Sequence, residues 1–126
     1  MTDSLRILAI EDDPDLSYLY ESYLGAEGHR VSTARNGEQA LRRLNDHPDV
    51  VLLDLMVPGL DGYAILRHMR ARRDLRDVPV VVVSAAVPPG RTRIPGADAV
   101  VNKPFEFDGL MRAIEGVSHQ VHAGHH

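Results

Sequence analysis

The segment Val50-Val51-Leu52-Leu53-Asp54 places an ionisable carboxylate directly after an uninterrupted apolar run. Four apolar residues without polar alternation predict a central strand of a parallel sheet, covered on both faces by helices. In open α/β sheets, ligands bind in the crevice beyond the carboxyl ends of the strands. A carboxylate that is buried there without a partner is costly in free energy. The segment therefore predicts a functional site at Asp54, to which other parts of the chain contribute.

Strand-like and helix-like segments alternate along the rest of the chain. Strands are expected at residues 5–10, 30–34, 50–54, 78–83 and 100–101. Apolar residues recur at helical spacing in the segments between and after them, and these apolar stripes are expected to face the core: Leu16, Leu19, Tyr20, Tyr23 and Leu24; Ala40, Leu41 and Leu44; Ile65, Leu66 and Met69; Phe107, Leu110, Met111 and Ile114. Asn36-Gly37 is expected to form a turn and residues 56–62 a loop. Strands separated by helices predict one α/β domain with a parallel sheet.

Composition restricts the class of protein. The chain has 126 residues, of which 44% are hydrophobic and 25% charged, as expected for a single globular domain. It contains neither a stretch of ~20 apolar residues nor the pattern of a signal peptide. The lack of cysteine excludes disulfide and thiolate chemistry, and the net charge of −4 argues against non-specific nucleic-acid binding. We therefore expect a cytoplasmic protein without a direct nucleic-acid or membrane partner.

Polar side chains follow four of the five predicted strands. Glu11 and Asp12 follow the first strand, Asp54 the third, Ser84 the fourth, and Lys103, the only lysine, the fifth. Because the carboxyl ends of parallel strands meet at one edge of the sheet, these residues are expected to share one crevice. Carboxylate oxygens suit a hard cation such as Mg²⁺. An acidic pair alone is a weak signal, but the five residues together form a specific constellation.

Over residues 5–117, the chain resembles the receiver (response regulatory) domain of two-component response regulators. The resemblance is carried by residues 7–14 (ILAIEDDP), 53–62 (LDLMVPGLDG), 83–85 (VSA) and 103–105 (KPF). It implies a flavodoxin-like three-layer sandwich, in which a five-stranded parallel sheet has the order 2-1-3-4-5.

The resemblance also implies a role for each site residue. Asp54 would accept a phosphoryl group from the phosphohistidine of a sensor histidine kinase or histidine phosphotransferase. Lys103 and the Ser84 hydroxyl would contact phosphoryl oxygens, and the Lys103-Pro104 bond would be cis. The domain would not be an enzyme in the usual sense, because it would assist only its own phosphorylation and dephosphorylation. Its signal would pass through altered protein contacts, with a downstream target that the sequence does not name.

A Mg²⁺ cofactor is the second implication of the resemblance. Its ligands would be Asp12, Asp54 and the backbone carbonyl of Met56, and Glu11 would act largely through water. Phosphoryl transfer depends on positioning and on neutralisation of oxygen charge, which a metal beside the acceptor would supply.

Two enzymatic alternatives are disfavoured and one binding alternative stays open. A magnesium-dependent phosphatase of the haloacid dehalogenase type would have a second acid two residues after Asp54, where this chain has Met56. A nucleotide-binding domain would have a glycine-rich turn after the first strand, where residues 11–15 read EDDPD. The open alternative is a receiver fold used as a phosphorylation-independent interaction module.

The segment between Ser84 and Lys103 departs from the family pattern. Pro95 disfavours helical geometry at Ile94, so we predict that the usual fourth helix is absent or reduced to about one turn. Val100 stands where receivers commonly have a Tyr or Phe, which predicts that aromatic–hydroxyl coupling is absent. The dimer face that receivers commonly use includes this fourth helix, and we therefore do not assume the usual receiver dimer.

Three further features receive structural interpretations. The arginines at positions 67, 70, 72, 73 and 76 predict a solvated basic face. The receiver domain is expected at residues 1–118, followed by a disordered or tag-derived tail at residues 119–126 that contains His119, His122, His125 and His126. The exposed face of the first helix flanks the acidic site and is the expected docking face for a kinase or phosphotransferase.

Overall fold

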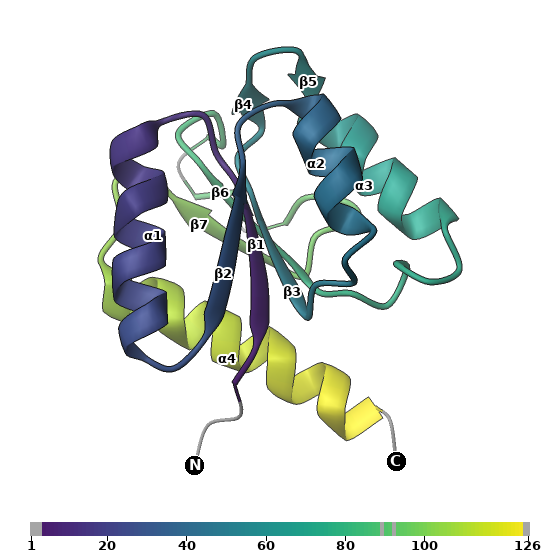
Figure 1. Ribbon diagram of the computed structural model, residues 1–126. Helices are drawn as coiled ribbons and strands as arrows, with labels where there is room; N and C mark the ends of the chain where they lie inside the picture. Colours follow the sequence, from purple (N-terminus) through teal and green to yellow (C-terminus); the bar gives the residue numbers. More distant parts are fainter. Residues whose placement is uncertain (1–3, 89, 92, 125–126) are drawn as a thin grey trace.

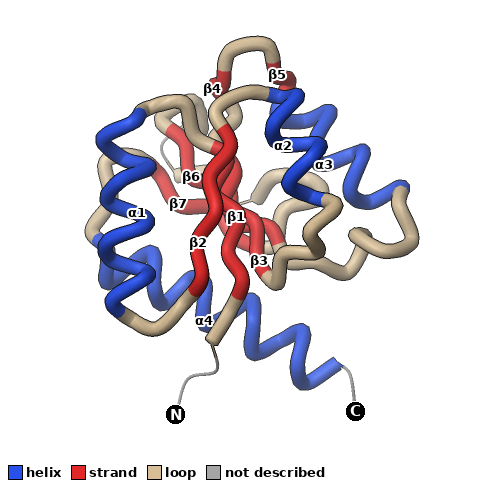
Figure 2. The backbone as a smooth tube through the Cα atoms, in the orientation of Figure 1, coloured by secondary structure: helices blue, strands red, loops and turns tan. Residues whose placement is uncertain are grey.

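The chain folds into a parallel sheet between two layers of helices (Figures 1 and 2). The computed structural model describes residues 4–88, 90–91 and 93–124, with the backbone alone for Leu60 and residues 119–124. The sheet strands are β1 (Arg6–Ile10), β2 (Arg30–Ala34), β3 (Val50–Leu53), β6 (Val80–Ser84) and β7 (Ala99–Asn102). The helices are α1 (Pro14–Ala26), α2 (Gly37–Leu44), α3 (Gly62–Ala71) and α4 (Phe107–Gly124).

The sheet has the strand order β2-β1-β3-β6-β7, and every neighbouring pair is parallel. In terms of these five strands the order is 2-1-3-4-5, so the predicted fold class and topology are confirmed. Two short strands, β4 (Met56–Val57) and β5 (Leu60–Asp61), form a separate antiparallel ribbon where the sequence predicted a loop. The ribbon lies at the carboxyl edge of the sheet, beyond the end of β3.

Two hydrophobic cores flank the central strands. All residues of β3 and β6 are buried, as the uninterrupted apolar runs predicted. Within β3, Val51 and Leu53 pack with α2 and α3, whereas Val50 and Leu52 pack with α1 and α4. A strand with apolar neighbours on both faces is held rigidly. The end of β3 is therefore a fixed platform for Asp54.

Helix α1 contacts the sheet along a narrower line than its apolar pattern predicted. Tyr20 and Leu24, four residues apart, are fully buried, but Leu19 is 41% exposed and Tyr23 is 52% exposed. The ring of Tyr23 stacks instead on Phe107 of α4, with ring centroids 4.2 Å apart. The inward assignment of Leu19 and Tyr23 is thus wrong, because both lie at the rim of the core.

The start of α2 also differs from the prediction. Asn36 does not form a turn with Gly37; its side-chain oxygen accepts a hydrogen bond from the Gln39 N–H at 2.9 Å and caps the helix. Within α2, Ala40 and Leu44 are buried as predicted. Leu41 is 41% exposed, so its predicted inward position is wrong.

The connection between β6 and β7 has no helix in the residues described there, 85–88, 90–91 and 93–98, which confirms the predicted loss of the usual fourth helix. Side-chain hydrogen bonds from α3 support the connection instead. The Arg70 guanidinium donates to the carbonyl of Gly96 from Nε at 2.9 Å and from Nη2 at 2.7 Å, and to Asp98 Oδ2 at 2.9 Å. Its Nη1 donates to the carbonyls of Arg76 and Val78, at 2.9 and 2.8 Å. Arg70 is therefore a structural residue and not part of a solvated face.

Helix α4 continues to Gly124, past the expected domain boundary at residue 118. The backbone at residues 119–124 is helical, and the domain boundary at residue 118 stays a prediction. The side chains of His119 and His122, and all of His125 and His126, lie outside the described residues. No helix in the described part of the chain combines the length and the apolar composition of a membrane span.

Candidate functional site

Four strand ends bring the predicted polar residues together at the carboxyl edge of the sheet. Glu11 follows β1, Asp54 follows β3, Ser84 ends β6, and Lys103 follows β7. The parallel register aligns these ends, because Leu53 pairs with both Ile10 and Val82 and β7 runs alongside Ser84. The predicted convergence of these residues is confirmed by the contacts described next.

Asp54 lies at the centre of the site, with its side chain almost fully buried. Oδ1 accepts hydrogen bonds from the Ser84 hydroxyl and from the Met56 N–H, both at 2.9 Å. Oδ2 accepts a hydrogen bond from Lys103 Nζ at 2.7 Å, and the same ammonium donates to Glu11 Oε1 at 2.6 Å. Lys103 and Ser84, to which the resemblance assigns phosphoryl contacts, thus contact the Asp54 carboxylate itself.

The environment shifts the pKa values of these groups. Burial acts to raise the pKa of Asp54, but hydrogen bonds from Lys103, the Met56 N–H and Ser84 outweigh it, so the pKa lies below its ordinary value. Burial acts to lower the pKa of Lys103, but Asp54 and Glu11 outweigh it and the pKa is raised. At neutral pH, Asp54 is therefore an ionised carboxylate facing a charged ammonium.

Glu11 has the opposite shift from Asp54. Burial raises its pKa, and the hydrogen bonds from Lys103 and from the Asp13 N–H offset this only in part. Asp13 itself caps α1, since its side chain accepts a hydrogen bond from the Asp15 N–H at 3.0 Å. The site therefore holds a second acidic group whose ionised form gains from any added positive charge.

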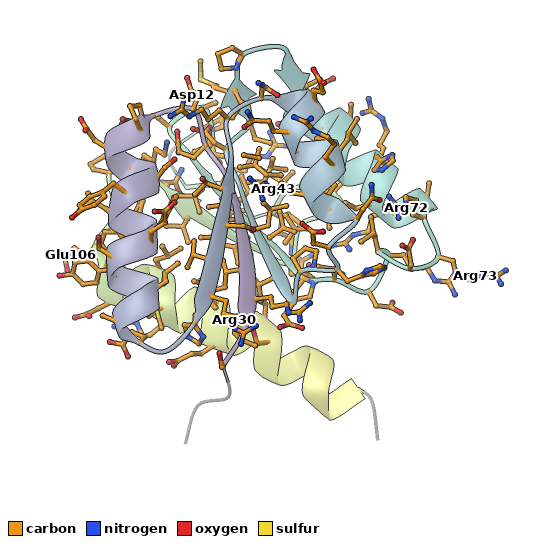
Figure 3. All side chains as sticks on the ribbon, viewed as in Figure 1. Asp12, Arg30, Arg43, Arg72, Arg73 and Glu106 are labelled. Carbon is orange, nitrogen blue, oxygen red and sulfur yellow. The ribbon has the colours of Figure 1, made fainter. Side chains whose placement is uncertain are left out.

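Three carboxylates of the site are close enough to share a metal ion. Glu11, Asp12 and Asp54 each offer one oxygen, and these oxygens lie within 4.8 Å of one another. Asp12 is exposed at the start of the α1 connection, where Figure 3 labels it, and the other two are buried. An all-oxygen, acidic set is the donor chemistry that Mg²⁺ prefers. The predicted carboxylates therefore fit the cation, whereas the role of the Met56 carbonyl stays a prediction.

The β4–β5 ribbon supports the segment after Asp54. Gly59 turns the ribbon with a positive φ of 68°, a conformation that favours glycine. Gly62 begins α3 so close to Leu55 that a Cβ at this position would lie 2.8 Å from Leu55 Cδ2. Sequence reasoning did not assign a role to Gly62, although its position after Asp61, the cap of α3, was a usable signal.

Loop residues beyond β6 are hydrogen-bonded to the site. The Ser84 hydroxyl, which donates to Asp54, accepts a hydrogen bond from the Ala86 N–H at 3.1 Å. Asn102 Nδ2 donates to the Val87 carbonyl at 3.1 Å, a contact that sequence reasoning missed. The Lys103-Pro104 peptide bond is cis, as predicted. A change at the Asp54 carboxylate can therefore reach Ala86 through a single hydroxyl group.

Residues 7–115 match the family model described as the response regulator receiver domain. The chain belongs to the response regulator receiver domain family. Members of this family act in two-component systems. The strand-end residues described above lie within the matched range.

Related sequences include transcriptional regulators. The chain is 33% identical over 105 residues to the uncharacterized transcriptional regulatory protein YrkP of Bacillus subtilis (strain 168), covering 83% of this chain and 46% of the relative. It is 34% identical over 116 residues to the phosphate regulon transcriptional regulatory protein PhoB of Rhizobium meliloti (strain 1021), covering 89% and 51%. The chain thus spans about half the length of these relatives.

Solved structures with the same fold include receiver domains from other protein contexts. NtrX from Brucella abortus, solved in complex with ADP, has a TM-score of 0.84 at 30% identity, over 98% of this chain and 29% of that one. The receiver domain of sensor histidine kinase PA1611 from Pseudomonas aeruginosa PAO1 has a TM-score of 0.82 at 30% identity, over 92% and 98%. That domain carries a magnesium ion coordinated in its active-site cleft.

Proposed function

We propose that this receiver domain accepts a phosphoryl group on Asp54 from the phosphohistidine of a sensor histidine kinase or histidine phosphotransferase. The observation that carries the proposal is the state of Asp54. Its carboxylate is 7% exposed and ionised, and it faces the one ammonium group and the one hydroxyl group of the site. A purely structural ion pair would not require a hydroxyl donor and two further carboxylates around it.

The hydrogen bonds indicate which oxygen forms the new bond. Asp54 Oδ1 accepts from two donors, whereas Oδ2 accepts from Lys103 alone and keeps a free lone pair. In the proposed step, Oδ2 attacks phosphorus, an O–P bond forms, and the P–N bond of the phosphohistidine breaks with its electron pair returning to the imidazole. Lys103 Nζ and Ser84 Oγ then exchange carboxylate contacts for phosphoryl oxygens, which carry more negative charge.

Mg²⁺ is the cation that we propose for the carboxylate set. Glu11, Asp12 and Asp54 would hold it, and it would neutralise oxygen charge during transfer. Lys103 alone cannot balance three carboxylates, so the site has an excess of negative charge in the absence of a cation. That excess repels an incoming phosphoryl group and predicts that transfer depends on added divalent metal.

The phosphoryl donor is proposed to dock beside the site, between α1 and α4. An apolar pocket of about 390 Å³ lies there, lined by Leu16, Leu19, Ala85, Lys103, Pro104, Phe105 and Phe107. The exposed side chains of Leu19 and Tyr23 extend this surface along α1. Exposed apolar side chains next to a charged site are typical of a protein-binding surface. The pocket reaches Lys103, so a domain bound there can present its histidine to Asp54.

The domain is proposed to act only on its own phosphoryl group and to signal through altered protein contacts. Ser84 connects Asp54 to Ala86, and Val100, partly buried against the α2–α3 core, supplies no aromatic ring for the usual coupling. The signal is therefore proposed to reach partners through the β6–β7 connection. We also propose that the whole protein has an output of the kind that its relatives have, such as transcriptional regulation.

Intact mass spectrometry tests the proposal. The wild-type chain and the Asp54→Asn variant are incubated with acetyl phosphate and Mg²⁺, with parallel samples in EDTA. We expect the mass of one phosphoryl group to be added to the wild type in Mg²⁺ only. Absence of this adduct with acetyl phosphate and with phosphoramidate would instead support the phosphorylation-independent interaction module.

A further inference from the structure

A second pocket lies at the opposite end of the sheet from Asp54. It has a volume of about 230 Å³ and lies beside the C-terminal end of α2, at the beginnings of β1 and β2. Its lining includes Arg6 of β1, Arg30 of β2 and Arg43 of α2, together with one carboxylate, Asp46. Glu11 is five residues beyond Arg6, or about 16 Å along an extended strand, so the pocket is separate from the phosphorylation site.

The arginines of this pocket differ from Arg70 of α3 and Arg72 at its end. Arg70 and Arg72 each lie close to an aspartate oxygen, at 2.9 and 2.6 Å. Among the described residues, no ion pair within 4.0 Å includes Arg6, Arg30 or Arg43. The residues that line the hollow thus include three arginines and a single acidic residue, in a chain with a net charge of −4.

The fold itself brings these charges together. Arg43 lies in the last turn of α2, where a cation is favoured by the helix dipole. That effect does not explain Arg6 and Arg30, which start two neighbouring strands and face each other in the register of the sheet. Figure 3 shows Arg30 near the beginning of β2 and Arg43 beside α2. Like charges placed this closely repel each other unless an anion lies between them.

We propose that this pocket binds a small molecule that carries a diphosphate group. Guanidinium groups form paired hydrogen bonds with phosphate oxygens, and three of them can surround such a group. Ser32, which also lines the pocket, adds a hydroxyl donor. A volume of about 230 Å³ suits a compact anion. The acidic chain as a whole opposes a long nucleic-acid ligand.

Chemical shift titration of the ¹⁵N-labelled chain tests the proposal, with inorganic pyrophosphate added in metal-free buffer. Under these conditions the carboxylates around Asp54 repel the anion. We expect saturable shifts at Arg6, at residues 30–32 and at Arg43. Arg30→Gln should weaken the affinity by about tenfold, as expected for the loss of a charged hydrogen-bond donor. Asp46→Asn should tighten it by severalfold, because the one negative group is removed.

Arg73→Gln is the matched control. It removes the same charge from an exposed position outside the pocket and should leave the affinity unchanged within about twofold. The spectrum of each variant shows whether it is folded. A parallel titration with uridine diphosphate distinguishes the sources of the diphosphate. Tighter binding than pyrophosphate would assign a nucleoside diphosphate, and equal binding would assign the diphosphate group alone.

Four results would overturn the proposal. The first is the absence of saturable shifts with either compound up to tens of millimolar. The second is equal weakening by Arg73→Gln and Arg30→Gln, which indicates a general charge effect. The third is a set of shifts centred on Asp54. The fourth is tighter binding of an oligoglutamate peptide than of either diphosphate, which assigns the surface to an acidic protein partner.

Discussion

At the scale of single residues, the sharing of Lys103 between two carboxylates defines the site. Its ammonium lies 2.7 Å from Asp54 Oδ2 and 2.6 Å from Glu11 Oε1. Asp54 also receives hydrogen bonds from Ser84 and Met56, and its ionised form is the more stable one. Glu11 has fewer donors, and burial raises its pKa, so that its ionised form is less favoured than that of an ordinary glutamate. Lys103 thus favours the ionised form of Asp54. It compensates the burial of Glu11 only in part, so a cation would further stabilise the ionised form of Glu11.

The pKa of Asp54 predicts a contribution to stability that depends on pH. Because it lies below the ordinary value of 3.8, the ionised carboxylate stabilises the fold. This stabilisation is fully present above pH 3.8 and is lost as the pH falls through the lower folded value. We therefore expect Asp54→Asn to flatten the acid limb of the free energy of unfolding, measured by urea denaturation at a series of pH values. Asp77→Asn is a matched control. If the free energy of unfolding falls equally steeply with pH in the wild type and in Asp54→Asn, the lowered pKa of Asp54 is contradicted.

Gly62 is predicted to be a positioning residue for the acceptor loop. An alanine Cβ at Gly62 would lie 2.8 Å from Leu55 Cδ2 and 2.9 Å from Leu55 Cα, next to Asp54. We expect Gly62→Ala to lower the free energy of unfolding by about 1–3 kcal/mol, as for other overpacked sites, and to slow phosphorylation by acetyl phosphate. Gly25→Ala is the control, since its Cβ meets nothing within 4 Å, and it should stabilise α1 by up to about 1 kcal/mol. Similar stability of the two variants would show that Leu55 can move aside.

At the scale of elements, the buried strands were predictable and the exposed boundaries were not. The runs at Val50–Leu53 and Val80–Ser84 leave no polar face, so only a central position suits them. Helical spacing cannot show how wide the buried stripe is, and so Leu19 and Tyr23 were placed inward although both lie at the rim. Two-residue strands such as Met56–Val57 are too short for a periodic signal, because partner contacts define them.

The site was predictable to a similar extent. The residue types and the rule that parallel strands end together were enough to assemble Glu11, Asp54, Ser84 and Lys103. The detailed contacts were not predictable, since the sharing of Lys103 and the hydrogen bond from Asn102 to Val87 depend on side-chain geometry. The loss of the fourth helix could be predicted because Pro95 restricts the preceding backbone.

Arg70 is predicted to replace part of the support that a fourth helix would give. Its guanidinium joins α3 to the β6–β7 connection through Gly96 and Asp98. We expect Arg70→Gln to lower the free energy of unfolding by about 1–3 kcal/mol, because several hydrogen bonds to a charged donor are lost together. The measurement is urea denaturation, with Arg67→Gln as the control. Arg67 lies 3.8 Å from its aspartate partner with both side chains mostly exposed, and its loss should change stability by less than about 0.5 kcal/mol. Equal effects of the two variants on the free energy of unfolding would contradict the structural role of Arg70.

At the scale of the whole molecule, the receiver has the acidic cluster at its strand ends, and its β6–β7 connection differs from that of other receivers. The carboxyl edge of the sheet carries the acidic site, and the opposite edge carries the arginine pocket. Between β6 and β7, residues 85–88, 90–91 and 93–98 form no helix that could join a dimer face. The face that receiver dimers commonly use is therefore altered in the described residues.

This altered surface predicts that the phosphorylated form remains a monomer. Beryllofluoride with Mg²⁺ imitates the phosphoryl group on an aspartate, so sedimentation velocity can be compared before and after its addition. We expect no change beyond a small compaction, and Asp54→Asn provides a control that lacks the acceptor. A new boundary at the mass of a dimer in the wild type alone would show that the remaining faces of β7 and α4 suffice for association.

The central claim is that Asp54 is the phosphoryl acceptor, and borohydride mapping tests it most directly. After incubation with acetyl phosphate and Mg²⁺, sodium borohydride reduces an acyl phosphate of aspartate to homoserine, which peptide mass spectrometry locates in the sequence. We expect homoserine at position 54 in the wild type, dependent on Mg²⁺, and no homoserine at any position in Asp54→Asn. Homoserine at position 12 or at another aspartate, or a phosphoryl adduct that persists in Asp54→Asn, would contradict it.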